Sequence, residues 1–277
     1  PQRRAGRAEG MGNTERLRYL EAVVTVVELN EHRQKGATLK VSEIFGPTLQ
    51  GEGRSAGRRC SFVRLGLCNL DCSFCDTPFT WDWNGKNGTT YDRKVELTTM
   101  AIYDVLDEVD RVANNEPMMV VISGGEPLVQ AAGLDSLVDK LLDSGVATCV
   151  EIETNGTFIP SPLLQEYGKP DGPLSFNVSP KLGCSGVDPR KAIVPEALRA
   201  FNELQASFKF VVASADDIAE IVQLQATGDI RGEDIWIMPE GTSAETINKR
   251  FPALFDTAVK NGWSCSTRLH VLAHNDE

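Results

Sequence analysis

Short apolar runs of strand length alternate along most of the chain with longer stretches that have helical periodicity. Residues 118–122 are apolar throughout, as in a strand buried on both faces. Residues 131–144 then repeat apolar positions at intervals of three and four, which is typical of an amphipathic helix. Repeated strand–helix pairs predict parallel strands joined by helices, and therefore an α/β fold.

The predicted elements follow one another from residue 13 to residue 272. Strands are expected at 40–45, 60–65, 118–123, 147–153, 174–178, 208–212, 235–238 and 268–272, with a Gly-rich loop after the first. Helices are expected at 13–34, 98–114, 131–144, 195–204, 216–225 and 243–261, with Thr98 or Thr99 capping the second. Six strands of barrel type are too few for a closed eight-stranded barrel. The expected fold is therefore a partial (open) (β/α)6-type barrel.

Two segments interrupt this alternation. Residues 1–38 combine a basic lead-in with the helix expected at 13–34, and they predict an N-terminal extension before a barrel domain at 39–277. Residues 81–92 are polar and contain two glycines. They predict a surface loop inside the barrel domain.

Composition and charge narrow the class of protein. The 277 residues carry a net charge of −11, which disfavours a large nucleic-acid surface because phosphate binding depends on Lys and Arg. No apolar stretch approaches the roughly 20 residues of a membrane span, and no secretory signal is recognisable. We therefore expect a cytoplasmic protein that binds neither nucleic acid nor a membrane directly.

The seven cysteines are an odd number in a chain without a recognisable export signal, which disfavours a disulfide framework. Three of them, Cys68, Cys72 and Cys75, form a CxxxCxxC motif, whereas the other four are scattered. Iron–sulfur clusters usually take four thiolates. Three thiolates would hold a [4Fe–4S] cluster and leave one iron open, as a catalytic centre requires.

A zinc site is the alternative interpretation of this motif. Zinc would need a fourth Cys or His at regular spacing, typically in a second pair. The chain has three His and no second CxxC. The cluster is therefore the favoured hypothesis.

Polar and glycine-rich segments follow the ends of five predicted strands. They lie at 66–77, 123–127, 153–156, 179–181 and 238–241. In parallel α/β folds the carboxyl ends of the strands meet at one edge, where ligands bind. We therefore expect one active site at that edge.

The CxxxCxxC motif resembles the signature of the radical S-adenosylmethionine (SAM) superfamily. More narrowly, the chain from about residue 40 to 272 resembles the 7-carboxy-7-deazaguanine synthase family. The resemblance rests on "EIFGPTLQGEG", "FVRLGLCNLDCSFCDT", "SGGEP", "ETNG", "SPK" and "RLHVL". The element "TLQGEG" discriminates most, because the superfamily at large lacks it.

This resemblance implies the cofactors, the reaction and the partners. The cofactors are a [4Fe–4S] cluster, SAM and Mg²⁺, and reduction of SAM gives a 5′-deoxyadenosyl radical. The implied reaction converts 6-carboxy-5,6,7,8-tetrahydropterin to 7-carboxy-7-deazaguanine with loss of ammonia, in 7-deazapurine (queuosine-type) biosynthesis. The implied partners are a reducing protein such as flavodoxin or ferredoxin and a second copy of the chain in a homodimer.

The resemblance also assigns residues by motif match. The cluster ligands are Cys68, Cys72 and Cys75, and the Mg²⁺ ligand is Thr77. The SAM contacts are Phe74, Cys75, Asp76, Gly124, Gly125, Ser179, Pro180 and Lys181, where the glycines are expected to let the ligand approach the backbone. The substrate contacts are Leu49, Gln50, Gly51, Arg64 and Ser123. A guanidinium in an apolar strand, such as that of Arg64, suits a bidentate contact with a carboxylate.

Two other functions stay open from the sequence alone. A radical SAM activase that installs a glycyl radical on a partner protein would share the cysteine motif and the barrel, but would not need "TLQGEG" or Arg64. A zinc-stabilised binding module would have neither cluster nor activity. The C-terminal "LAHNDE" also differs from the Pro-terminated tail of shorter relatives, which leaves the substrate-closing contacts undefined.

Overall fold

The computed structural model describes residues 36–274, so the helix expected at 13–34 lies outside the described residues. The described chain is built on a nine-stranded sheet with the order β3-β1-β2-β4-β5-β6-β7-β8-β9. Its strands are β1 (Thr38–Leu49), β2 (Arg59–Leu65), β3 (Thr98–Ala101), β4 (Met118–Gly124), β5 (Ala147–Thr154), β6 (Leu174–Val178), β7 (Ser207–Val212), β8 (Ile235–Pro239) and β9 (Ser264–Cys265). Its α-helices are α3 (Arg93–Glu96), α4 (Ile102–Val112), α5 (Ala131–Asp143), α6 (Pro162–Tyr167), α7 (Pro189–Ala192), α8 (Pro195–Glu203), α9 (Ala215–Ala226), α10 (Ala244–Asn261) and α11 (Leu269–His274).

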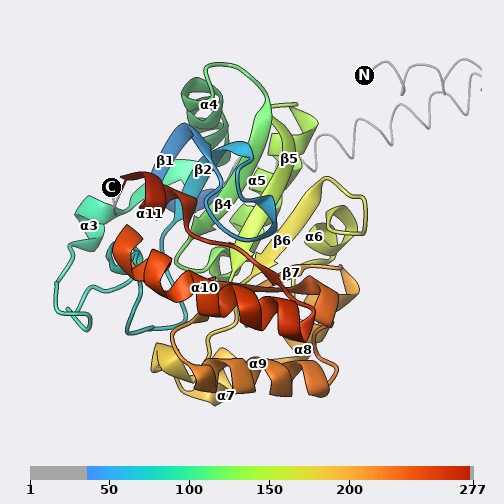
Figure 1. The fold of residues 1–277 in the computed structure, drawn as a ribbon. Coiled ribbons are helices and arrows are strands. Elements are labelled where there is room, and N and C mark those ends of the chain that lie inside the picture. The colour runs from blue at the N-terminus through green and yellow to red at the C-terminus, as the bar shows by residue number, and fades with distance from the viewer. Residues whose placement is uncertain (1–35, 275–277) are drawn as a thin grey trace, which may run out of the picture.

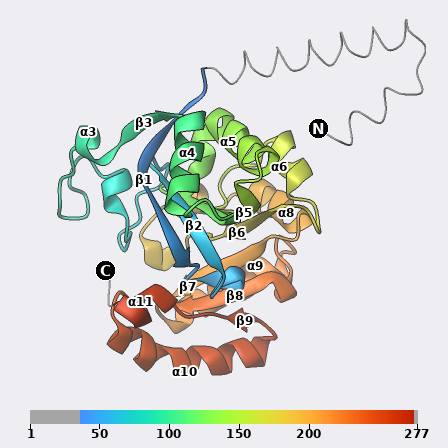
Figure 2. The same ribbon diagram turned by 90° about the horizontal axis from the view of Figure 1, so that it is seen from above.

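The wall of the fold is a run of parallel strands. Strands β2, β4, β5, β6, β7 and β8 pair in parallel in that order, and the short β9 extends the run. At the other edge β1 pairs antiparallel with both β2 and β3. The sheet curves but does not close on itself, with the helices outside it (Figures 1 and 2). The predicted α/β partial barrel with six wall strands is confirmed.

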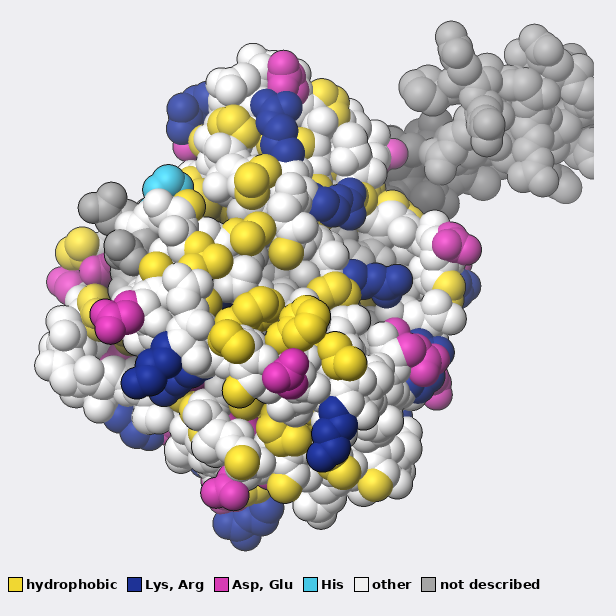
Figure 3. Space-filling model, in the orientation of Figure 1, with side chains coloured by type: hydrophobic (Ala, Val, Ile, Leu, Met, Phe, Trp, Pro, Cys, Tyr) yellow, Lys and Arg dark blue, Asp and Glu magenta, His cyan; other side chains and the backbone are white. Residues whose placement is uncertain are grey.

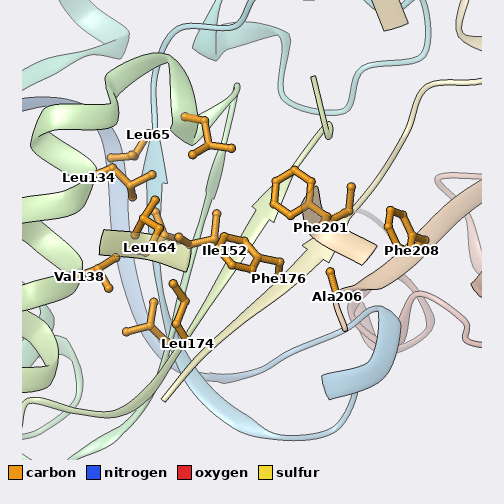
Figure 4. Close-up of a cluster of buried hydrophobic side chains, with 14 of the residues drawn as sticks. Leu65, Leu134, Val138, Ile152, Leu164, Leu174, Phe176, Phe201, Ala206 and Phe208 are labelled. Atoms are coloured by element: carbon orange, nitrogen blue, oxygen red, sulfur yellow. The ribbon is translucent and has the colours of Figure 1, made fainter. Parts of the chain in front are cut away.

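The main hydrophobic core lies between the sheet and the helices that cover it. Leu134 and Val138 of α5 are fully buried and face side chains of the wall strands, among them Leu65 and Ile152 (Figure 4). Further along the sheet, Phe176 of β6 meets Phe201 of α8 edge to face, with ring centroids 5.1 Å apart. Burying a side chain of this size stabilises the fold by about 1.5–3 kcal/mol.

The helix predicted at 98–114 is wrong in its first turn. Thr98–Ala101 forms strand β3, which pairs with Thr38–Val41 of β1, and helix α4 begins at Ile102. The expected caps Thr98 and Thr99 are therefore strand residues, and the residue preceding the helix is Ala101, whose side chain cannot cap. β-branched threonines fit an extended edge strand, and pairing with β1 outweighs their capping preference.

The strand predicted at 40–45 is longer in the structure, because β1 runs from Thr38 into the first residues of the expected Gly-rich loop and ends at Leu49. Its pairing with β2 shifts register between Phe45 and Thr48, so Pro47, which has no N–H to donate, lies in an irregularity.

The strand predicted at 268–272 is also wrong, since Leu269–His274 is helix α11. Only Ser264–Cys265 pairs with β8. The backbone N–H of Leu269, free at the start of the helix, donates to the carbonyl of Gly51 at 2.9 Å. The start of this helix is therefore tied to a loop that is distant in the sequence.

The surface mixes charged and apolar side chains. In the view of Figure 3, apolar side chains gather over α10, where Phe255 is 51% and Val259 68% exposed. Within residues 36–274, no helix is both long enough and apolar enough to cross a bilayer.

Candidate active site

A cavity of about 710 Å³ lies at the carboxyl ends of the parallel strands. It is bordered by the loop after β1, by the cysteine loop (residues 66–77), by the ends of β4 to β8 and by the segment that leads into α11. The predicted site residues that border it are Leu49, Gln50, Gly51, Arg64, Cys68, Cys72, Phe74, Cys75, Asp76, Thr77, Ser123, Gly124, Gly125, Ser179 and Lys181. Pro180 is buried and does not reach the cavity. The structure thus brings the predicted residues together at one edge.

The three motif thiols border this cavity and pack beside the apolar side chains Leu70, Val187 and Ala192. Burial raises the pKa of the Cys68 thiol to about 12 and that of Cys72 above its ordinary value. Metal binding would have to displace these protons. All three thiols face the same cavity, where a cluster held by them would lie.

Side chains from neighbouring strands hold the cysteine loop. Asn69 accepts a hydrogen bond from Asn155 Nδ2 at 2.9 Å and donates to Thr157 Oγ1 at 2.9 Å. On the other side, the backbone N–H of Ser73 donates to the carbonyl of Ser185 at 2.9 Å. The "ETNG" segment after β5 therefore positions the loop that carries the thiols.

The glutamate of "SGGEP" ties these strand ends together. Glu126 is fully buried and accepts hydrogen bonds from the backbone N–H of Asn155 at 2.7 Å and from Thr154 Oγ1 at 2.8 Å. Its backbone N–H donates to the carbonyl of Leu67 at 2.8 Å. Burial raises the pKa of this carboxyl. Glu126 is therefore a structural bridge between the ends of β2, β4 and β5.

The "TLQGEG" loop contributes a glutamine whose side chain is engaged within the protein. Gln50 is 2% exposed, and its Nε2 donates to Glu151 Oε1 at 2.7 Å and to Glu153 Oε1 at 3.2 Å. Ser123 Oγ donates to the other oxygen of Glu153 at 2.7 Å. Two predicted substrate contacts therefore converge on Glu153, a carboxylate that borders the cavity and that sequence reasoning missed.

Two cations also border the cavity, the buried Lys209 of β7 and the partly buried Arg268 near α11. Lys209 pairs with Glu52, and Arg268 pairs with Glu52 at 2.8 Å and with Asp76 at 2.5 Å. Burial alone would raise the pKa of Glu52, but the charges of Lys209 and Arg268 outweigh it and hold the pKa well below its ordinary value. These cations are therefore neutralised within the protein.

Arg64 differs from them because part of its guanidinium is free. Its Nε donates to Glu43 Oε1 at 2.6 Å, and its guanidinium carbon lies 5.7 Å from the centre of the Phe45 ring. Neither Nη nitrogen has a hydrogen-bond partner among the described residues. The outer edge of the guanidinium remains available to a ligand in the cavity.

Comparisons with known proteins agree with this geometry. Residues 49–159 match the family model described as "4Fe-4S single cluster domain". The 7-carboxy-7-deazaguanine synthase of Pyrobaculum aerophilum is 33% identical, over 85% of this chain and 94% of its own. That of Rhodopirellula baltica is 32% identical, over 86% and 88%. The crystal structure of QueE from Escherichia coli superposes with a TM-score of 0.65 at 25% identity, covering 87% of this chain and 98% of its own.

The chain belongs to the 7-carboxy-7-deazaguanine synthase family. The resemblance drawn from the cysteine motif and "TLQGEG" is thereby confirmed. As a member of this family the protein is a radical SAM enzyme, with a [4Fe–4S] cluster and SAM as cofactors. The open barrel is the fold that it shares with QueE.

In this family member the structure shows a reason for the two glycines of "SGG" that the sequence did not reveal. Gly124 has a φ of +127°, and a Cβ there would lie 2.0 Å from the backbone oxygen of Leu65. A Cβ on Gly125 would lie 2.1 Å from the backbone oxygen of Leu67. The space that a side chain would occupy is filled by the end of β2 itself, so the glycines allow this strand end to pack before any ligand is considered.

His270 also borders the cavity in this family member, although the sequence analysis assigned it no role. Its ring packs so closely on the "TLQGEG" loop that a Cβ on Gly51 would lie 2.2 Å from its Nδ1. Burial lowers the pKa of His270, which favours the neutral ring near pH 7. Its only sequence signal was its place in "RLHVL", which was expected to be a strand.

Proposed function

We propose that the protein converts 6-carboxy-5,6,7,8-tetrahydropterin to 7-carboxy-7-deazaguanine with loss of ammonia. The observation that carries this proposal is the meeting of the "TLQGEG" loop, Arg64 and the motif thiols in one cavity. Its volume of about 710 Å³ lies within the range of small-molecule sites. The names of the relatives specify the product.

In this proposal Cys68, Cys72 and Cys75 would hold the [4Fe–4S] cluster, which when bound would supply the electron for reductive cleavage of SAM. SAM itself contacts Phe74, Cys75, Asp76, Gly124, Gly125, Ser179 and Lys181, whereas Pro180 of the predicted set is buried outside the cavity and only links the last two. Lys181 donates to Ser179 Oγ at 2.9 Å and has no carboxylate within ion-pair distance among the described residues. Its ammonium is therefore suited to the SAM carboxylate.

The substrate is held by charge at one end and by hydrogen bonds elsewhere. The free edge of Arg64 binds the pterin carboxylate through two charge-assisted hydrogen bonds. Glu153, held in place by Gln50 and Ser123, presents carboxylate oxygens to N–H groups of the ring. Leu49 and Gly51 line the cavity around the ring.

Product analysis tests this function. Full-length protein with a reconstituted cluster is incubated anaerobically with the carboxytetrahydropterin, SAM, Mg²⁺ and dithionite, and the products are analysed by mass spectrometry. We expect 7-carboxy-7-deazaguanine and ammonia in equal amounts. Protein with an intact cluster that cleaves SAM but never forms this product would refute the substrate and favour the activase alternative.

Thr77 is the proposed Mg²⁺ ligand. It borders the cavity, and its hydroxyl makes no capping bond to the short helix that follows. Among the described residues, the one side chain in hydrogen-bonding range of this hydroxyl is that of Cys75, with Sγ at 3.7 Å. Replacing Thr77 by Ala is expected to raise the Mg²⁺ concentration for half-maximal rate about tenfold, the equivalent of roughly 1.4 kcal/mol for one lost oxygen contact. Steady-state rates over a Mg²⁺ series measure this.

The matched control is Thr77→Ser, which keeps the hydroxyl and should retain the normal Mg²⁺ requirement. Iron content should stay unchanged in both variants. An unaltered Mg²⁺ dependence in Thr77→Ala would argue against the role.

The proposal includes two partners that the family resemblance implied. One is a one-electron donor protein such as flavodoxin or ferredoxin, and the other is a second copy of the chain. Replacing dithionite with reduced flavodoxin in the same assay checks the first. Light scattering of the purified protein checks the homodimer.

A further inference from the structure

The polar loop at residues 81–92 is fastened to the cysteine loop. Asp82 is 2% exposed and accepts hydrogen bonds from the backbone N–H groups of Lys86 at 2.9 Å and Asn87 at 2.7 Å, which fix the turn. Asn87 Nδ2 then donates to the carbonyl of Cys72 at 3.1 Å, and Lys86 pairs with Asp71. The expected surface loop is therefore a structured cover over the thiols.

The first residue of this loop reaches a thiol directly. Trp81 Nε1 lies 3.3 Å from Cys75 Sγ, and both residues border the cavity. An indole N–H can only donate, so the direction of this hydrogen bond is fixed. Within residues 36–274, Cys68 receives one hydrogen bond, from the backbone N–H of Leu70 at 3.5 Å. Among the three described motif thiols, Cys75 is the one with a side-chain N–H donor.

We propose that Trp81 raises the reduction potential of the cluster by donating its indole N–H to the Cys75 thiolate. This inference rests on the proposed ligation by Cys75, but not on the identity of the substrate. Hydrogen bonds to cluster sulfurs are one of the means by which proteins set cluster potentials. A donor stabilises negative charge on sulfur, and that charge increases when the cluster takes up an electron. The reduced cluster is therefore stabilised more than the oxidised one.

The test compares Trp81→Phe with wild-type full-length protein, both with reconstituted clusters. Phenylalanine keeps an aromatic ring against the cluster but removes the N–H. We expect a midpoint potential that is more negative by about 30–60 mV, which corresponds to a three- to tenfold lower ratio of reduced to oxidised cluster at a fixed potential. The potential is measured by redox titration followed by electron paramagnetic resonance, with no substrate present.

Trp83→Phe is the matched control. Trp83 lies two residues further along the same loop, near the Arg93 guanidinium at 6.0 Å, and does not border the cavity. Its replacement should leave the potential unchanged. An unchanged potential in Trp81→Phe, or an equal shift in both variants, would overturn the proposal. A wild-type protein that binds no cluster would instead refute the cluster ligation on which the proposal rests.

A second measurement does not use Trp81→Phe and so covers the case in which that variant loses its cluster. Wild-type protein is labelled with tryptophan carrying ¹⁵N in the indole ring, and the reduced cluster is examined by pulsed electron paramagnetic resonance. The hydrogen bond should produce a ¹⁵N coupling to the cluster spin that persists in Trp83→Phe. Absence of this coupling would rule out the bond to Cys75.

Discussion

Replacing Cys68, Cys72 or Cys75 by alanine is expected to eliminate the [4Fe–4S] cluster and all reductive cleavage of SAM. All three thiols border one cavity, and no further described cysteine does so. With two thiolates left, neither a cluster with three ligated irons nor its open iron for SAM can form. Iron and sulfide analysis after anaerobic reconstitution should fall from about four of each per chain to background.

Cysteines outside the motif provide the matched controls. Cys149 and Cys265 lie on β5 and β9 and do not border the cavity. Cys149→Ala and Cys265→Ala should keep both the cluster and the rate of SAM cleavage. A motif variant with full cluster content and normal turnover would show that the ligand assignment is wrong, provided that circular dichroism confirms its fold.

Replacing Arg64 by alanine is expected to lower kcat/KM for the carboxytetrahydropterin roughly 30- to 1,000-fold. This factor corresponds to a loss of about 2–4 kcal/mol of transition-state stabilisation. The variant loses a two-point contact that orients the substrate for reaction. Arg64→Lys should recover only part of the loss, because an ammonium group cannot reproduce the planar fork. SAM affinity should stay unchanged in both variants.

Arg59 provides the control for Arg64, because it lies on the same strand and pairs with Glu116 at the exposed surface. Arg59→Ala should change kcat/KM less than about threefold, since exposed ion pairs contribute little. The fold should tolerate Arg64→Ala, because the Glu43 side chain left behind is already 46% exposed. Full activity of Arg64→Ala would refute the carboxylate contact, while leaving the substrate itself to product analysis.

The features that the sequence predicted best are those that depend on neighbouring residues alone. Strand β4 was recognisable because an unbroken apolar run leads into "SGGEP", and the helix expected at 243–261 matches α10 to within one residue, with Ser243 as its cap. The three thiols fall within eight residues of sequence, so their spacing alone brought them together. Parallel strands then placed the motifs that follow them at one edge of the sheet.

Residues whose role depends on pairing across the sheet were missed. Glu153 becomes a cavity carboxylate because Gln50 and Ser123, from two other strands or loops, hold its oxygens. Lys209 is a buried lysine whose charge is compensated by Glu52 and by Glu153, 3.7 Å away. A lysine between two phenylalanines in a predicted strand was the one available signal. The strand expected at 268–272 was wrong for a related reason, since this segment is a helix whose first N–H bonds to Gly51, far away in the sequence.

A hydrogen bond connects the "TLQGEG" loop to the segment before α11, and this affects when the cavity can form during synthesis of the protein. Gly53 donates its N–H to Ser266 Oγ across 213 positions of sequence. Because synthesis proceeds from the N-terminus, the thiols emerge from the ribosome long before Ser266 does. A nascent chain can therefore fold its early strands while one side of the cavity is still missing. The cavity can be completed only after the segment that contains Ser266 has been synthesised.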